Sequence, residues 1–146
     1  MYRYAIEELF KWKEKPNRKP MVIQGARHVG KTWLMKEFGK KAYTHTVYIN
    51  FEDNVTMEDL FSYDLDTNRL ITGIELYSDQ KIDPDNTLLI FDELQEVPRA
   101  LTSLKYFNEN VPEYHIVCAC SFTGIDLHQG TSFPVGESGF YESLSS

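Results

Sequence analysis

The amino-acid sequence predicts an α/β fold built around a parallel β-sheet. Short apolar and β-branched runs alternate along the chain with longer segments that have helical periodicity. In addition, the runs 87–92 and 115–120 are apolar almost throughout, as strands buried on both faces of a sheet are. Together these two observations favour strands that are joined by crossover helices.

The composition is typical of a single globular domain. The chain has 146 residues, of which 42% are hydrophobic and 25% charged, enough to bury a core of its own. No apolar run approaches the ~20 residues that span a bilayer, so we expect no membrane partner. The N-terminus has acidic residues where an export signal needs a long apolar stretch. We therefore expect a cytoplasmic protein.

The first part of the chain predicts two strands and two helices. Residues 4–15 place apolar side chains on one helical face, and residues 21–24 form a short apolar strand. A helix follows over residues 30–38, with Gly39 as its C-terminal cap. The β-branched and aromatic run 46–51 predicts the next strand.

The second part continues the alternation. Residues 56–76 are helical in one or two pieces, and residues 84–86 form a turn. The apolar runs at 87–92 and 115–120 are strands, separated by a helix over 98–108 that Pro98 begins. We find no internal repeat.

The segment between the strand at 21–24 and the helix after it matches the phosphate-loop pattern G-x-x-x-x-G-K-[ST]. Glycines let backbone N–H groups reach phosphate oxygens, and the helix N-terminus adds a positive dipole end. Lys31 would reach the β- and γ-phosphates, and Thr32 would offer its hydroxyl to Mg²⁺. The alternative is a chance glycine-rich turn with a solvated lysine. The predicted nucleotide-binding residues are Gly25, Ala26, Arg27, His28, Val29, Gly30, Lys31, Thr32 and Trp33.

Two acids follow the apolar run TLLIF, at the strand end where open α/β sheets bind ligands. Asp92 would hold Mg²⁺ through water, and Glu93 would position or deprotonate the attacking water. The alternative is that this pair caps the helix that begins near Pro98. Ser121 ends the following strand, where it could contact the γ-phosphate or the water, or could simply terminate the strand in a turn.

Charge is distributed unevenly along the chain. Residues 1–50 carry eleven Lys/Arg against four Glu, whereas residues 51–146 carry four against eighteen acids. The basic part contains the phosphate loop and the acidic part contains the predicted magnesium ligand. With a net charge of −7, a broad nucleic-acid surface is disfavoured for this segment. Cys118 and Cys120 lie two apart in one strand, and we interpret both as small core residues.

Several stretches taken together resemble a known family. The chain is similar to the AAA-type P-loop ATP-binding proteins of bacteria and archaea, which begin with an ATPase domain and continue into a C-terminal domain of unknown function. The similarity covers about residues 2–136. The stretches that carry it are RKPMVIQGARHVGKTWLMKEFGK, VYINFE, TLLIFDELQEVPRALTSLKYF, EYHIVCACS and LHQGTSFPVG.

This resemblance implies a P-loop NTPase three-layer sandwich that binds Mg²⁺ and ATP. The sheet would be of the additional-strand type, with order 2-3-4-1-5 and residues 115–120 between the loop strand and the acidic strand. The resemblance assigns catalytic roles to Glu93, Lys31 and Ser121, and metal binding to Thr32 and Asp92. Cys120 stands where the family usually has glycine.

The match stops after Gly136. We therefore expect an incomplete ATPase domain over residues 1–136 and an irregular tail over 137–146. The fifth strand and the lid of the family would be missing, and the loop strand would expose one edge.

The main functional hypothesis is ATP hydrolysis, in the full-length form, coupled to a protein partner or a missing C-terminal domain. The alternative is a nucleotide-binding module, or a truncated fragment, with little or no turnover. A GTPase is disfavoured because no N-K-x-D motif follows the acidic strand. A small-molecule kinase is disfavoured because no arginine-bearing lid follows the last strand.

Overall fold

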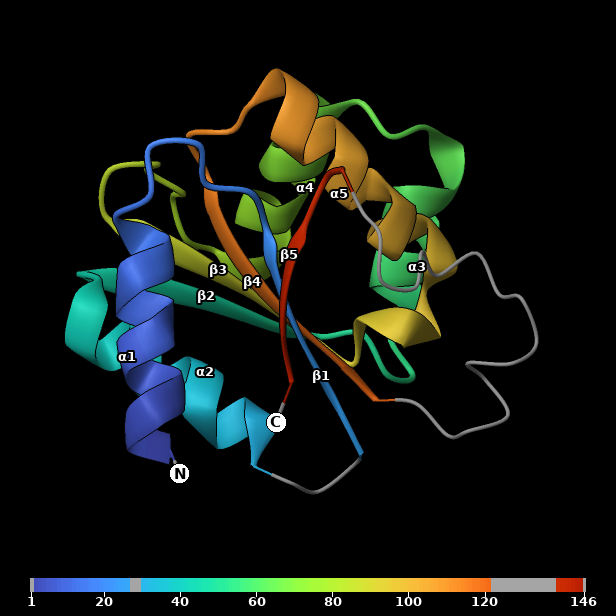
Figure 1. Cartoon of the computed structure of the whole chain (residues 1–146). Coiled ribbons are helices and arrows are strands. Elements are labelled where there is room, and N and C mark those ends of the chain that lie inside the picture. Colours follow the sequence, from blue (N-terminus) through green and yellow to red (C-terminus); the bar gives the residue numbers. More distant parts are fainter. Residues whose placement is uncertain (1, 27–29, 122–138, 146) are drawn as a thin grey trace.

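The structure is a computed structural model of the chain that describes residues 2–26, 30–121 and 139–145. Five parallel strands form one sheet in the order β2-β3-β4-β1-β5 (Figure 1). The predicted α/β class and strand order are therefore confirmed. The strands are β1 (Met21–Gly25), β2 (His45–Asn50), β3 (Thr87–Asp92), β4 (His115–Ser121) and β5 (Glu142–Ser145).

Helices cover both faces of this sheet, which makes the three layers that the resemblance implied (Figure 1). One face packs against α1 and α2, and the other against α3, α4 and α5. Within the described part of the chain, no helix combines the length and apolar character needed to cross a bilayer. The helices are α1 (Tyr2–Lys13), α2 (Lys31–Ala42), α3 (Val55–Tyr63), α4 (Thr67–Ser78) and α5 (Pro98–Asn110), with the 3₁₀ turn η1 (Leu94–Glu96) before α5.

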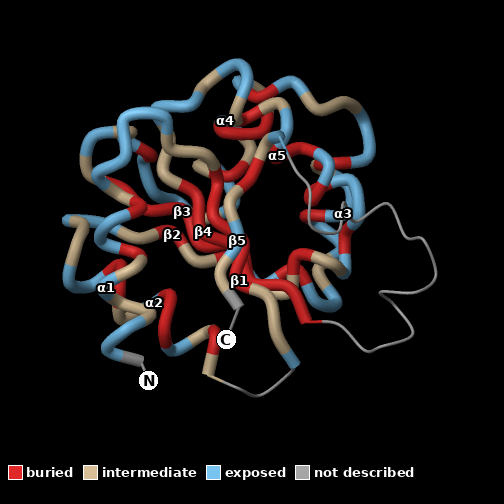
Figure 2. Tube along the Cα trace, viewed as in Figure 1, coloured by how far each residue is buried: buried red, intermediate tan, exposed pale blue. Residues whose placement is uncertain are grey.

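The central strands are apolar on both sides because each side meets its own helical layer. In β3, Leu88 and Ile90 join the cluster under α1 and α2, whereas Leu89 and Phe91 join the cluster under α3, α4 and α5. Strand β4 alternates in the same way, and Cys118 and Cys120 both lie in the second cluster, as predicted. Buried residues run along the middle of the sheet in Figure 2.

The prediction that the fifth strand is missing is wrong. Strand β5 pairs in parallel with β1, with Val22 opposite Ser143 and Ile23 opposite Leu144. The Glu142 backbone N–H donates to the Pro20 carbonyl at 2.8 Å, and the Lys15 ammonium lies 2.7 Å from the Glu142 carboxylate. The expectation of an exposed edge on β1 is therefore also wrong, because β1 has a neighbour on each side.

Sequence patterns did not reveal this strand because the run ESLS has one large apolar residue and no β-branched residue. A short polar run is nonetheless compatible with an edge strand, which packs less of its surface than a central one. Residues 142–145 are consequently not irregular, contrary to the expectation for the tail. The predicted domain boundary at residue 136 lies outside the described residues, and the absence of a lid stays a prediction.

Gly39 does not cap α2, because the helix continues to Ala42 and ends at Tyr43. Its role is steric. A Cβ atom at this position would come within 2.3 Å of the Thr46 Cγ2 atom, and the Leu88 side chain is also close. Glycine therefore lets the helix lie directly against the start of β2.

The bounds of the remaining elements lie within about two residues of the predicted ones. The helical stretch at 56–76 forms two pieces, α3 and α4. The Asp66 carboxylate begins α4 by accepting from the Arg69 backbone N–H at 2.9 Å. The turn at 84–86 precedes β3, whose bounds coincide with the predicted strand.

Candidate functional site

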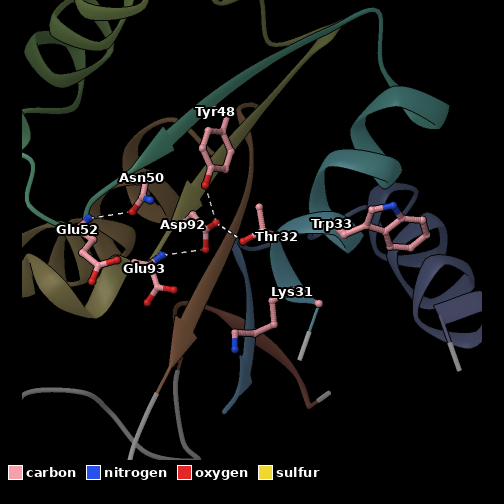
Figure 3. A pocket seen from close by; sticks show the side chains of 9 residues that line it. Lys31, Thr32, Trp33, Tyr48, Asn50, Glu52, Asp92 and Glu93 are labelled. Atoms are coloured by element: carbon pink, nitrogen blue, oxygen red, sulfur yellow. Dashed lines mark hydrogen bonds between the residues drawn. The ribbon is translucent and has the colours of Figure 1, made fainter. Parts of the chain in front are cut away.

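The candidate site lies where the carboxyl ends of β2 and β3 meet the N-terminus of α2. It is an open pocket of about 650 Å³, in the position where parallel α/β sheets bind ligands. Figure 3 shows most of its polar side chains directed toward one another. The pocket is lined by Gly30, Lys31, Thr32, Trp33, Tyr48, Asn50, Glu52, Asp92 and Glu93.

In the described part of the phosphate loop, a left-handed glycine precedes the helix and the lysine is its first residue. Gly30 adopts a left-handed conformation (φ 85°, ψ 16°) immediately before α2 begins at Lys31, a conformation that suits glycine. The Lys31 ammonium donates to the Gly25 carbonyl at 3.2 Å and to the Ala26 carbonyl at 2.5 Å. The lysine is thus 5% exposed and lies across the start of the loop. The predicted residues between these two parts, Arg27, His28 and Val29, lie outside the described residues.

Thr32 and Asp92, which are 60 residues apart in sequence, meet directly. The Thr32 hydroxyl donates to Asp92 Oδ2 at 2.5 Å. The Tyr48 hydroxyl donates to the same oxygen at 2.7 Å, and the Glu93 backbone N–H donates to Oδ1 at 3.0 Å. Both carboxylate oxygens of this buried aspartate are therefore held in place (Figure 3).

Burial raises the pKa of Tyr48, and its hydrogen bond to Asp92 raises it further. The phenol therefore stays protonated and acts as the donor in this pair. The Lys36 ammonium lies 4.0 Å from the centroid of the Tyr48 ring, on the side of α2. The tyrosine thus connects β2, β3 and α2 at one point.

The donor chemistry around Thr32 and Asp92 fits Mg²⁺. A hydroxyl and a carboxylate are the oxygen ligands that this cation accepts, together with substrate phosphates and water. Among the described residues there is no group of three or more His, Cys, Asp or Glu side chains suited to a metal. A metal here would accordingly draw its remaining ligands from phosphate oxygens and water.

Glu93 has an unusual backbone. Its φ and ψ of 54° and 45° place a non-glycine residue in the left-handed region, where strain is often found at functional sites. Its carboxylate Oε1 accepts from the Gln95 amide nitrogen at 2.8 Å. The alternative that the acidic pair caps the helix near Pro98 is wrong, because the residue before α5 is Val97 and no side chain caps it.

Ser121 is the last residue of β4 and lies opposite Gly25 in the register of the sheet. Its backbone N–H donates to the Gln95 amide oxygen at 3.1 Å. Its hydroxyl is buried, and among the described atoms it has no hydrogen-bond partner. Such an orphaned polar atom calls for a missing partner, and a phosphate oxygen or a water would provide one.

Trp33, another predicted nucleotide-binding residue, is the third residue of α2. It lines the pocket and is 52% exposed. In Figure 3 its indole is directed away from the group formed by Thr32, Asp92 and Glu93.

Four site residues were not found from the sequence. Tyr48, Asn50 and Glu52 line the pocket from the end of β2, and Gln95 bridges from η1. Asn50 lies opposite Asp92 in the sheet, and its side chain accepts from the Glu52 backbone N–H at 2.9 Å. The alternation of polar residues in YINFE, next to the acidic strand, is the signal that could have revealed the first three.

A family model described as "AAA domain" matches residues 17–145. Among solved structures, the chain is similar to PCH-2 of C. elegans, with 13% identity and a TM-score of 0.49, over 99% of this chain and 39% of that one. It is also similar to the ORC1 protein of Aeropyrum pernix in complex with DNA, with 12% identity and a TM-score of 0.54, over 99% and 43%. The chain thus spans less than half the length of either protein. No curated protein matches its sequence.

Proposed function

The chain belongs to the family that the AAA domain model describes, and from that premise we propose that it binds ATP with Mg²⁺ and hydrolyses it to ADP and phosphate. The observation that carries the proposal is the meeting of Lys31 and Thr32 with Asp92 and Glu93 around one pocket. These residues come from two motifs that are 60 residues apart. Their combination is what phosphoryl transfer from a nucleoside triphosphate requires.

Binding would rest on the loop and the start of α2. The backbone N–H groups at this helix N-terminus attract phosphate oxygens. The Lys31 ammonium, which contacts two loop carbonyls, would exchange them for the β- and γ-phosphates. The lysine is pre-positioned, because its side chain already lies across the loop.

When bound, Mg²⁺ would neutralise charge on the phosphates. Thr32 and Asp92 would hold it, and Tyr48 and the Glu93 backbone would hold Asp92. These contacts keep the carboxylate oriented without help from the nucleotide.

Hydrolysis would use Glu93 as the base. Its carboxylate would accept a proton as the water oxygen attacks the γ-phosphorus, and the bond from that phosphorus to the bridging oxygen of ADP would break. The orphaned hydroxyl of Ser121 would donate to the γ-phosphate or orient the water. We further propose that a protein partner or a further domain uses this hydrolysis.

The first prediction concerns Lys31. Replacing it by Ala should weaken ATP binding by about tenfold or more, because a charge-assisted hydrogen bond contributes ~1.5–3 kcal/mol. The matched control is Lys40→Ala, which removes an exposed lysine from the other end of α2. Titration calorimetry with ATP and Mg²⁺ would measure both variants, and an affinity that Lys31→Ala leaves unchanged would refute the proposal.

A further inference from the structure

Gln95 joins two residues of the site that come from different strands. It lies in η1, half-buried, between β3 and α5. Its amide nitrogen donates to Glu93 Oε1 at 2.8 Å, and its amide oxygen accepts from the Ser121 backbone N–H at 3.1 Å. One side chain thereby links the proposed base to the end of β4.

The chemistry of the two partners fixes how this amide is oriented. A backbone N–H can only donate, so the Gln95 oxygen must face Ser121. An ionised carboxylate can only accept, so the Gln95 nitrogen must face Glu93. An amide is a neutral group that meets both demands at once. An ionised glutamate at this position could not donate to Glu93.

Resting on the proposed hydrolysis, we propose that Gln95 is a positioning residue that holds the Glu93 carboxylate at a fixed place relative to Ser121. Glu93 itself has a left-handed backbone conformation and comes directly before the short turn η1. This backbone conformation alone leaves several rotamers open to its side chain. The hydrogen bond from Gln95 selects one of them. The hydrogen bond from the Ser121 backbone N–H holds the Gln95 amide at the end of β4, where the γ-phosphate would lie.

This arrangement makes the base and the serine respond together. A shift of the β4 end would move the Gln95 amide, and the amide would move the Glu93 carboxylate. A displacement of about 1 Å in a catalytic group can cost about a hundredfold in rate. Gln95 should therefore affect turnover strongly and nucleotide binding little, since it does not line the pocket.

Two substitutions separate the hydrogen bonds from simple packing. Gln95→Met keeps a similar length and removes the hydrogen bonds to Glu93 and Ser121, together with the longer one of 3.5 Å from the amide nitrogen to the exposed Glu96 carboxylate. Gln95→Glu keeps the acceptor for Ser121 and replaces the donor to Glu93 by a like charge. The matched control is Gln80→Glu, the same change at an exposed glutamine after α4.

Steady-state phosphate release and ATP affinity provide the first test. Both Gln95 variants should lower kcat by about tenfold or more, with KM and ATP affinity within about threefold of the parent chain. Gln80→Glu should stay within about twofold of the parent. In a Glu93→Ala background, Gln95→Met should change the residual rate by less than about twofold, because nothing remains to be positioned. An unchanged kcat in both Gln95 variants, or an equal loss in the Glu93→Ala background, would overturn the proposal.

A second measurement tests the contact without turnover. In the nucleotide-free chain, Glu93→Ala should shift the ¹H–¹⁵N resonances of the Gln95 side-chain amide, and Gln95→Met should speed hydrogen exchange at the Ser121 backbone amide. Unchanged Gln95 resonances in Glu93→Ala would overturn the proposal. If the parent chain released no phosphate, the proposed hydrolysis would be wrong. The contact between Gln95 and Glu93 would then be tested by these resonances alone.

Discussion

At the residue scale, the site depends on hydrogen bonds that keep charged groups in place before any ligand arrives. Asp92 accepts from Thr32, Tyr48 and the Glu93 backbone. Leaving a buried carboxylate without such partners costs several kcal/mol. The partners therefore serve stability and orientation together.

The second prediction concerns Tyr48. Replacing it by Phe removes one donor to Asp92 while keeping the ring under Lys36. We expect ATP affinity measured with Mg²⁺ to fall about threefold to tenfold, since a net hydrogen bond contributes ~0.5–1.5 kcal/mol. Affinity measured with EDTA should change less.

The control for this substitution is Tyr63→Phe, which removes the hydroxyl of an exposed tyrosine at the end of α3. It should leave both affinities unchanged. If Tyr48→Phe lowered ATP affinity equally with Mg²⁺ and with EDTA, that result would contradict a role for Tyr48 in orienting the Asp92 carboxylate toward the metal.

The third prediction concerns His115 at the start of β4, whose ring nitrogen Nδ1 lies 2.6 Å from the Tyr43 hydroxyl. Burial, with added repulsion from Arg18 and Lys13, lowers the pKa of His115 to about 4. The unfolded chain binds the proton near the ordinary pKa of 6.5, so it holds more protons than the folded chain between these values. The stability contributed by neutral His115 is present above about pH 6.5 and is lost as the pH falls toward 4.

Urea unfolding between pH 7.5 and 4 would check this pH dependence. The His115→Asn variant should lose less of its free energy of unfolding over that range than the parent chain does. His45→Asn, at an exposed histidine, should follow the parent. Parallel curves for the parent and His115→Asn would contradict the prediction.

The residues that meet in the pocket could be predicted from sequence only where a motif fixes the spacing. Lys31 and Thr32 follow from the glycine pattern, and Asp92 follows from its place at a strand end. Tyr48 and Gln95 could not be predicted as site residues, because their partners are far away in sequence or depend on side-chain geometry. Hydrogen bonds of this kind leave no periodic pattern in the chain.

At the element scale, the approach of α2 to the sheet sets where the phosphate loop lies. The helix begins at Lys31 in the site and passes over β2 at Gly39. The close contact of Gly39 with Thr46 fixes the position of α2 on the sheet, and the N-terminus of the helix lies at the pocket. The sequence alone predicts a helix cap at this glycine, because a helix-ending glycine and a close-packing glycine look alike in one sequence.

The fourth prediction is that Gly39→Ala destabilises the chain by about 1–3 kcal/mol. On an open helix face the same change would stabilise, because alanine is the better helix former by ~1 kcal/mol. Here its Cβ would lie 2.3 Å from the Thr46 Cγ2 atom. Chemical denaturation of the variant would measure the effect.

A double-mutant cycle with Thr46→Ala provides the control, because that substitution removes the Cγ2 atom. Gly39→Ala should cost less in the Thr46→Ala background than in the parent chain. The same cost in both backgrounds would contradict the close contact between α2 and β2.

Strands could be predicted in proportion to how apolar they are. The bounds of β3 agree with the run TLLIFD because that strand is buried along its whole length. Strand β5 cannot be predicted in this way, because its residues are mostly polar. Backbone pairing with β1 and the contact of Glu142 with Lys15 stabilise it. Pairing with an existing strand needs few apolar side chains of its own.

At the scale of the whole molecule, the sheet brings together groups that the sequence separates. Parallel β2 and β3 place Asn50 beside Asp92, and parallel β1 and β4 place Gly25 beside Ser121. The phosphate loop, the proposed metal ligands and the proposed base therefore meet at the carboxyl ends of the strands. This convergence was predictable, because parallel strands with crossover helices leave all their carboxyl ends on one side.

The central claim is that this assembly hydrolyses ATP with Glu93 as the base, and the fifth prediction tests it most directly. Phosphate release from ATP would be measured for the parent chain and for Glu93→Gln, alongside ATP affinity for both. The account predicts that the variant binds ATP as the parent does but releases phosphate about 10²–10⁴-fold more slowly. A phosphate release rate that is the same in both chains would contradict it and would favour a nucleotide-binding module without useful turnover.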